Sequence, residues 1–181
     1  MIKKWNQFIK ENNQYDFGCV MLDIPIKNWE KITNTIDKND IYNSEGYGLE
    51  RKPHLTILYG LTEEITLEDV KSKLDKFGPI EVEIDNIGFF DTNEEFDVVK
   101  FDVVKTDQLE EMFQSLSTLP NKNEFPDYKP HITISYLKKG CGKKYSKKIN
   151  KNLGKLEKII FSRPNGETKT FKLKNRSSFV D

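Results

Sequence analysis

The chain has 181 residues, of which 36% are hydrophobic and 32% are charged, and its formal net charge is zero. These values suit one compact, rather polar globular domain spanning residues 1–181. No apolar run approaches the ~18 residues that cross a bilayer, and the N-terminal residues lack the apolar segment of a signal peptide. The two cysteines, Cys19 and Cys141, form neither a disulfide framework nor a Cys-x-x-Cys metal motif, so we expect a reducing, cytoplasmic location.

From the N-terminus, the hydrophobic pattern predicts a strand, a helix, a second strand and a second helix. The strands are short apolar runs, and the helices carry apolar residues three or four positions apart. Asn28 and Thr66 stand where helix N-caps are expected. In chain order, these elements are expected at residues 17–24, 28–37, 52–60 and 66–77, with a long loop at residues 39–50.

The rest of the chain predicts a hairpin, a helix, a strand and a terminal hairpin. One pair of β-rich runs surrounds "DTNEE", and another surrounds "RPNGET", in which Asn-Gly is a strong turn signal. The amphipathic run before Pro120 is typical of a helix. In chain order, these elements are expected at residues 80–90, 95–105, 106–119, 129–137, 156–162 and 169–174. The whole pattern is that of an α+β protein.

A basic segment follows the strand expected at residues 129–137. Residues 138–155 contain eight lysines and no acidic residue. Such a run is most often a solvated loop or helix face. Because it lies close after a histidine in the sequence, an alternative role is to attract an anionic ligand toward that histidine.

Two segments have nearly the same sequence. "KPHLTILYG" begins at residue 52 and "KPHITISYL" begins at residue 129, and six of their first eight positions are identical. The two segments also contain the only histidines of the chain, His54 and His131. The repeat therefore predicts two strands in equivalent places of two related halves.

The repeat places an imidazole and a hydroxyl on one face of each strand. Side chains at positions i and i+2 of a strand share a face, about 7 Å apart, so Thr56 accompanies His54 and Thr133 accompanies His131. Two such strands side by side would bring two imidazoles and two hydroxyls to one cleft. Cleavage of a phosphodiester uses these groups, with one imidazole as base, one as acid, and donors to the non-bridging oxygens.

These residues could also have roles other than catalysis. A single histidine in a strand is usually a surface or hydrogen-bonded residue, but the duplicated pattern favours a site. A zinc site would need three or four ligands, and the sequence offers neither a third histidine nor clustered cysteines, so no metal is expected. By strict alternation, Tyr59 and Tyr136 fall on the face opposite their histidines, and we assign both to packing.

The segments "PHLTILYG" and "PHITISYL" resemble the paired His-x-Thr signatures of the two-histidine (2H) phosphoesterases, the superfamily of LigT-like RNA ligases and cyclic phosphodiesterases. Longer stretches, "GLERKPHLTILYGL", "FDVVKFDV" and "YKPHITISYLKKG", resemble a branch common in bacteriophages. That branch includes anti-CBASS phosphodiesterases, which degrade the cyclic oligonucleotide signals of bacterial immunity. The resemblance implies two pseudo-symmetric lobes of antiparallel sheet with flanking helices around a central cleft, with one motif in each lobe.

The resemblance also implies roles for the motif residues. His54 and His131 would be the general base and acid, in an order left open, while Thr56 and Thr133 would bind the phosphate. No metal or other cofactor is implied. The implied substrate is a cyclic di- or trinucleotide, cut at a 3′–5′ linkage by way of the neighbouring 2′-hydroxyl, in the host bacterial cytoplasm. No membrane and no stable nucleic-acid partner is expected, and protein partners are left open.

Residues that hold the bases are predicted on weaker patterns. Aromatic side chains stack on bases, and the candidates are Phe17, Tyr47, Phe89 and Phe90. Glu157 is a candidate acceptor for an adenine amino group.

Two other functions stay open at this point. One is a LigT-like enzyme that acts on RNA ends or 2′,3′-cyclic phosphates, which the basic segment at residues 138–155 would suit. The other is a non-catalytic protein that sequesters a cyclic nucleotide, against which the intact histidines and threonines argue.

Overall fold

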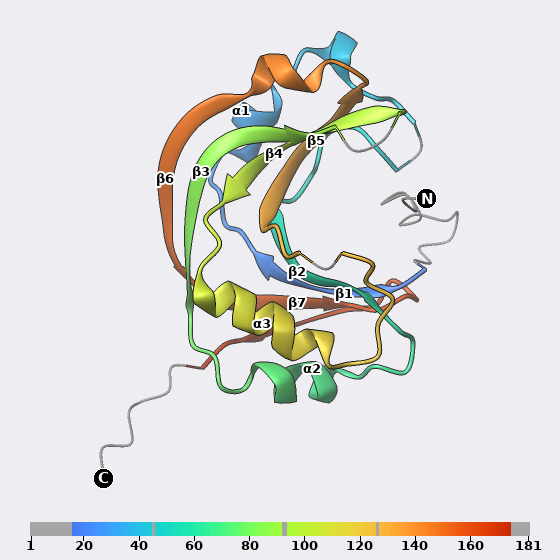
Figure 1. Ribbon diagram of the computed structural model, residues 1–181, viewed down its shortest axis with the longest axis vertical. Coiled ribbons are helices and arrows are strands. Elements are labelled where there is room, and N and C mark those ends of the chain that lie inside the picture. The colour runs from blue at the N-terminus through green and yellow to red at the C-terminus, as the bar shows by residue number, and fades with distance from the viewer. Residues whose placement is uncertain (1–15, 45, 92–93, 126, 175–181) are drawn as a thin grey trace.

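Two antiparallel sheets make up the body of the protein in the computed structural model, which describes residues 16–44, 46–91, 94–125 and 127–174 (Figure 1). Each sheet has four strands, in the order β2-β1-β7-β8 in the first and β5-β4-β3-β6 in the second. The strands are β1 (Gly18–Asp23), β2 (His54–Leu61), β3 (Ile80–Phe90), β4 (Phe96–Val103), β5 (His131–Lys138), β6 (Lys147–Leu156), β7 (Lys158–Ser162) and β8 (Thr168–Lys172). The helices are α1 (Trp29–Thr33), α2 (Leu67–Leu74) and α3 (Asp107–Ser117), with 3-10 turns η1 (Lys38–Asp40) and η2 (Gly142–Tyr145). The α+β architecture of two related lobes is as expected.

The two repeat segments form the edge strands where the sheets meet. β2 is the outer strand of the first sheet and β5 is the outer strand of the second, and the two lie beside each other in the middle of the molecule (Figure 1). The hydroxyl of Tyr128, just before β5, donates to the carbonyl of Thr56 in β2 at 3.2 Å. The fold therefore brings both His-x-Thr motifs to one place.

The helices begin where the sequence provides caps, with one exception. Thr66 and Asp69 form a reciprocal capping box at the start of α2, and the Thr106 side chain accepts from Leu109 N at 3.3 Å at the start of α3. Asn28 does not cap α1, because its backbone is left-handed, at φ 57°, instead of extended as side-chain capping requires. α1 also ends earlier than expected. Among the described residues, no helix has the length and apolar character needed to cross a membrane.

One hydrophobic cluster runs through both lobes. Leu55 and Ile57 of β2 and Ile132 and Ile134 of β5 are among its buried members. These residues alternate with the motif side chains, which are half-buried on the other face. Burial of the apolar face therefore fixes which way each His-x-Thr pair points.

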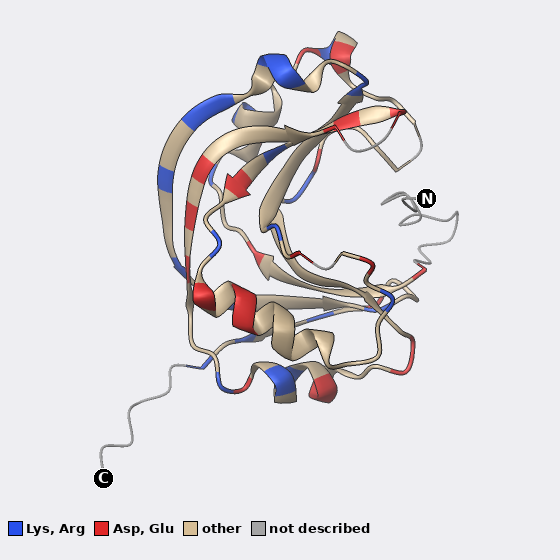
Figure 2. Cartoon of the chain, in the orientation of Figure 1, with Lys and Arg blue, Asp and Glu red and all other residues tan. Residues whose placement is uncertain are grey.

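The lysine-rich segment is neither the loop nor the helix face that the sequence predicted. Much of it is β6, which pairs with β3 at the edge of the second sheet farthest from β5. The half-buried Ile149 and Leu153 pack against the core, while the lysines are exposed, as charges on an edge strand usually are. Acidic residues of β3 lie next to them (Figure 2), and Lys148 is paired with Asp85. Two strands thus separate β6 from β5, which carries the second histidine.

Candidate active site

Both histidines are held by the same local contact. Nδ1 of His54 lies 3.0 Å from the carbonyl of Lys52, and Nδ1 of His131 lies 2.8 Å from the carbonyl of Lys129. A carbonyl only accepts hydrogen bonds, so Nδ1 carries a proton in each ring. Nε2 is then the nitrogen that accepts a proton when the ring is neutral and gives one when it is charged.

Both repeat strands contain a β-bulge at the same place. In β2, Ile57 is an extra residue, because Thr56 and Leu58 pair with consecutive residues of β1. In β5, Ile134 is the extra residue, because its two neighbours likewise pair with consecutive residues of β4. A bulge shifts the alternation of the residues that follow it.

The bulges turn Tyr59 and Tyr136 toward the motif residues. On the partner strands, Cys19, Met21 and Asp23 face Tyr59, Thr56 and His54, and Val98, Lys100 and Asp102 face Tyr136, Thr133 and His131. Since the partners alternate regularly, each tyrosine shares the face of its histidine. The assignment of both tyrosines to packing on the opposite face is wrong, because strict alternation does not continue past a bulge.

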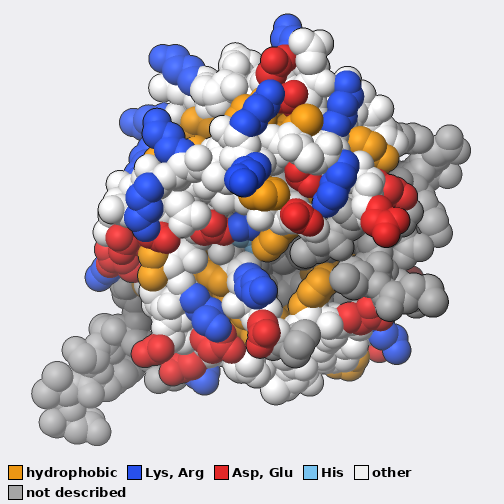
Figure 3. Space-filling model, turned by 45° about the horizontal axis from the view of Figure 1, so that its top comes forward, with side chains coloured by type: hydrophobic (Ala, Val, Ile, Leu, Met, Phe, Trp, Pro, Cys, Tyr) orange, Lys and Arg blue, Asp and Glu red, His pale blue; other side chains and the backbone are white. Residues whose placement is uncertain are grey.

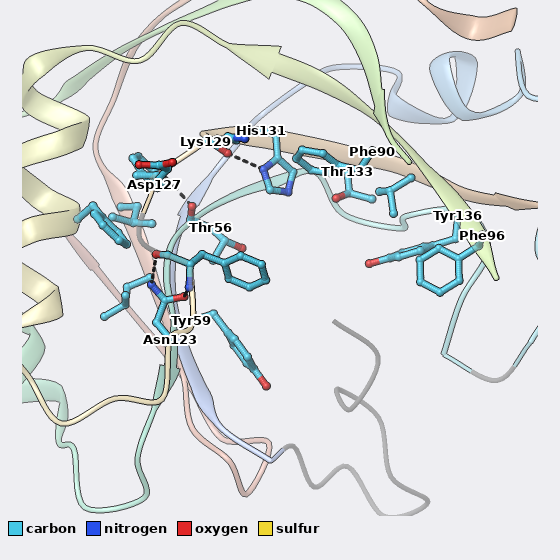
Figure 4. A pocket seen from close by; sticks show the side chains of 16 residues that line it. Thr56, Tyr59, Phe90, Phe96, Asn123, Asp127, Lys129, His131, Thr133 and Tyr136 are labelled. Carbon is cyan, nitrogen blue, oxygen red and sulfur yellow. Dashed lines mark hydrogen bonds between the residues drawn. The ribbon is translucent and has the colours of Figure 1, made fainter. Parts of the chain in front are cut away.

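A cavity of about 210 Å³ lies between the two motifs. Thr56, His131 and Thr133 line it together with several aromatic rings (Figure 4). His54 lies at the start of β2, outside the lining but near enough for its charge to affect His131. The aromatic lining includes Tyr59, Phe90, Phe96, Phe113, Phe125 and Tyr136.

Two of the predicted base-binding residues lie close to this cavity. Phe90 lines it, and its ring packs edge-on against His131 with centroids 4.9 Å apart. Phe17 lies outside the lining but packs edge-on against Tyr59 at 5.9 Å. The first therefore faces the site directly, and the second supports a tyrosine that does.

Tyr47 belongs to an aromatic cluster at the edge of the cavity. Its ring lies 5.2 Å from those of both Phe96 and Tyr136, which line the cavity. Burial raises the pKa of Tyr47 to about 12, so its hydroxyl stays protonated at neutral pH. Tyr47 therefore packs against two residues of the cavity wall without lining the cavity itself.

The other two candidates lie away from the cavity. Phe89 points to the opposite face of β3, where it packs against Gly142 of η2. Glu157 lies between β6 and β7 and forms an ion pair with Lys172 of β8 at 2.5 Å. The structure does not bring either residue to the motif side chains.

Phe125 is a lining residue that the sequence did not point to. It lies in the segment between α3 and β5, and 40% of it is exposed. Asn123 braces this segment, since its Nδ2 donates to the carbonyl of Phe125 and its Oδ1 accepts from Phe125 N. A phenylalanine in a polar stretch shortly before the second motif was the available signal.

The surroundings of His131 keep its ring neutral. Burial is the main cause, and the charges of Lys100 and His54 add to it, so the pKa of His131 falls to about 4. The hydrogen bond with the Lys129 carbonyl and the charge of Asp102 act in the other direction. At neutral pH, Nε2 of His131 is therefore a proton acceptor.

Within the described part of the chain, no three His, Cys, Asp or Glu side chains are grouped as ligands for a metal ion. The polar groups at the cavity include the His131 imidazole, the hydroxyls of Thr56 and Thr133, and the side chains of Asn123, Asp127 and Lys129, and aromatic rings line the rest. This set can exchange protons, donate hydrogen bonds to an anion and stack on planar groups.

Comparisons with known proteins find the same fold elsewhere. The family model of the 2′-5′ RNA ligase superfamily matches residues 22–147. Escherichia coli LigT, solved with 3′-AMP, has a TM-score of 0.58 at 16% identity, over 88% of this chain and 95% of that chain. Usb1 from Kluyveromyces marxianus has a TM-score of 0.55 at 6% identity, over 89% and 99%. A Thermus thermophilus protein, TT0787, has a TM-score of 0.52 at 15% identity, over 87% and 95%. No curated protein matched the sequence.

Proposed function

Because this chain belongs to the 2′-5′ RNA ligase superfamily of 2H phosphoesterases, we propose that it is a phosphodiesterase that cuts 3′–5′ linkages of cyclic oligonucleotides. Membership in the superfamily supports a phosphodiesterase-type enzyme. The observation that carries the proposal is the pair of histidines, each with Nδ1 held by a backbone carbonyl. The two motifs stand beside each other on adjoining strands.

In the proposed reaction, the 2′-hydroxyl next to the scissile linkage attacks the phosphorus. One histidine accepts the 2′ proton at Nε2, and the other gives a proton to the departing 5′ oxygen. The O2′–P bond forms as the P–O5′ bond breaks, which leaves a 2′,3′-cyclic phosphate. Thr56 and Thr133 donate to the non-bridging oxygens, where charge develops. The ribose itself holds the nucleophile in place, an advantage that water lacks.

The aromatic walls support a substrate with a base on each side of the scissile phosphate. Tyr59, from the first lobe, and Phe96 with Tyr136, from the second lobe, line the cavity at two separate places near the motif residues (Figure 4). A stacked base contributes roughly 1–3 kcal/mol. A cyclic di- or trinucleotide would occupy both walls, whereas a mononucleotide would occupy one.

Action on RNA ends or 2′,3′-cyclic phosphates is the second candidate, supported by LigT, which was solved with 3′-AMP. An RNA strand would need a basic path leading to the cleft. The lysines of β6 lie on the far edge of the second sheet, next to acidic residues of β3. On the face shown in Figure 3, basic and acidic side chains are interspersed. These positions favour a short, compact substrate.

The experiment is an assay of cyclic di- and trinucleotides, 2′,3′-cyclic mononucleotides and short RNAs, with a chelator present throughout. We expect cleavage of at least one 3′–5′-linked cyclic oligonucleotide, with a 2′,3′-cyclic phosphate detected by mass. The 2′-deoxy analogue should bind to the protein but should not be cleaved. Turnover of the RNAs or mononucleotides alone would favour the second candidate, and binding without turnover would favour a sequestering protein. Equal cleavage of the deoxy analogue would exclude attack by the 2′-hydroxyl.

A further inference from the structure

The strand beside β5 places an ion pair next to the second motif. On β4, Asp102 is directly opposite His131, and Lys100 is directly opposite Thr133. Opposed residues of an antiparallel pair point to the same face, with Cβ atoms about 5 Å apart. Lys100 donates to Asp102 and is only 5% exposed. A buried cation and its counter-ion thus lie beside the histidine and threonine.

β1, the strand beside β2, has an aspartate at the position equivalent to Asp102 but no lysine at the position equivalent to Lys100. Asp23 is opposite His54, and Met21 is opposite Thr56. Asp23 is paired instead with Lys158 of β7, an exposed side chain on the side away from β2. The two histidines therefore match in sequence and backbone contact but differ in the charge that faces them.

Lys100 is separated from the cavity by an aromatic ring. Its Nζ lies 4.2 Å from the centroid of Phe90, and the Phe90 ring packs against His131. Phe90 lines the cavity, whereas Lys100 is not among its lining residues. The cation thus acts on His131 through space, without touching a ligand in the cavity.

The surrounding backbone is shaped to hold this ion pair. Asn86 of β3 donates to the second carboxylate oxygen of Asp102. A Cβ atom at Gly88 would collide with that same oxygen, so a larger residue there would displace the Asp102 carboxylate. An ion pair with a buried cation and a half-buried carboxylate is seldom more stabilising than apolar residues of similar size. Stability alone is therefore a weak reason for the pair.

We propose that Lys100 is a positioning residue that makes the two histidines chemically unequal. Its buried cation disfavours a second positive charge on His131, so His131 accepts the 2′ proton and His54 gives a proton to the leaving 5′ oxygen. This assignment rests on the proposed phosphodiesterase function. Among the other groups that face His131, Asp102 and the Lys129 carbonyl favour its charged form, and a charged His54 opposes it.

The test uses the fact that the chain contains only two histidines. The imidazole Cε1–H signals in proton NMR give two titration curves, which the His54→Ala variant assigns. Lys100→Met, which copies the residue facing the first motif, should raise the midpoint of His131 by about one pH unit or more. Lys100→Gln removes the charge but still donates to Asp102, and it should act in the same direction. Lys100→Arg keeps the charge and should leave the midpoint near the parent value.

Lys105→Met is the matched control, because Lys105 follows β4 and is paired with Glu110 at the surface. It should leave the His131 midpoint unchanged. If neither neutral variant raises that midpoint, the role of Lys100 is refuted. The acid limb of the pH–rate profile should shift in the same direction as the His131 midpoint. If the midpoint shifts and the acid limb does not, His131 is not the base. A parent protein without turnover on any phosphodiester would refute the proposed function, while the charge effect of Lys100 would still be decided by NMR.

Discussion

At the residue scale, the site depends on where the proton sits on two imidazoles. The contact between Nδ1 and the carbonyl two residues earlier is local, and the Lys-Pro-His sequence provides it twice. The proline carbonyls inside the two motifs accept from Ile24 N and Val103 N, which ties each turn to the neighbouring strand. Proline gives up no ladder donor at this position, directly before the strand. The ring orientation is thus set by backbone geometry.

Protonation of His131 should make stability depend on pH. Its pKa is about 4 in the folded protein, against an ordinary value of 6.5 for histidine, so the unfolded state binds more protons between these values. The free energy of unfolding therefore falls as the pH drops from about 6.5 to 4. The free energy of unfolding is measured with urea at pH 7 and at pH 5. Its decrease between these two pH values should be about 2 kcal/mol larger in the parent than in His131→Asn. Equal falls in the two proteins would contradict the neutral state of the half-buried His131 ring.

At the element scale, the two bulges determine which side chains reach the site. Ile57 and Ile134 occupy equivalent places, and each turns the following tyrosine toward the cavity. Each sheet therefore contributes a threonine and a tyrosine to the cavity, which His131 lines and His54 lies beside. Equivalent bulges preserve the pseudo-symmetry of the two lobes.

Replacement of either tyrosine should weaken substrate binding. Tyr59→Leu and Tyr136→Leu each remove a stacking surface, so the KM for the best cyclic substrate should rise about tenfold or more while kcat changes little. Phe89→Leu is the control, because Phe89 lies on the opposite face of its strand, and its KM should stay at the parent value. Unchanged KM in both tyrosine variants would show that the bases bind elsewhere.

Much of the fold was predictable, because the alternation of apolar residues marks β1, β2, β5 and the hairpins. That the two His-x-Thr pairs lie on equivalent strands was predictable from the repeated segment. Bulges leave no mark in residue type, so the positions of Tyr59 and Tyr136 were not predictable. β6 was missed because its many lysines obscure the pattern of a strand that has few apolar residues. The Lys100 ion pair depends on strand register, which the sequence does not specify.

At the scale of the whole molecule, two sheets share one hydrophobic core and place the site where their edge strands adjoin. α2 and α3 pack against each other, and α3 also contacts β2 of the first sheet. The second sheet ends in the basic edge strand β6, far from the site across β3 and β4. Although the net charge is zero, the charges are unevenly distributed, and the basic edge formed by β6 does not face the cavity.

The lysines of β6 should therefore have little effect on a small substrate. A triple variant of Lys147, Lys148 and Lys151 to Gln should keep kcat/KM for a cyclic dinucleotide within about twofold of the parent, because charges beyond a Debye length are largely screened. The assay is run at physiological ionic strength, with short RNA in parallel. A loss of tenfold or more with the cyclic dinucleotide would mean that this edge helps to bind the substrate.

The central claim is that the two histidines of the repeat perform the proton transfers. The most direct measurement is the turnover of His54→Ala, His131→Ala and the double variant on the best cyclic substrate, with Kd measured on the same proteins. Each single variant should lose a factor of about 10² or more in kcat, and Kd should stay close to the parent value because the threonines and aromatic walls remain. A double variant that turns over at the parent rate would contradict the paired-histidine mechanism.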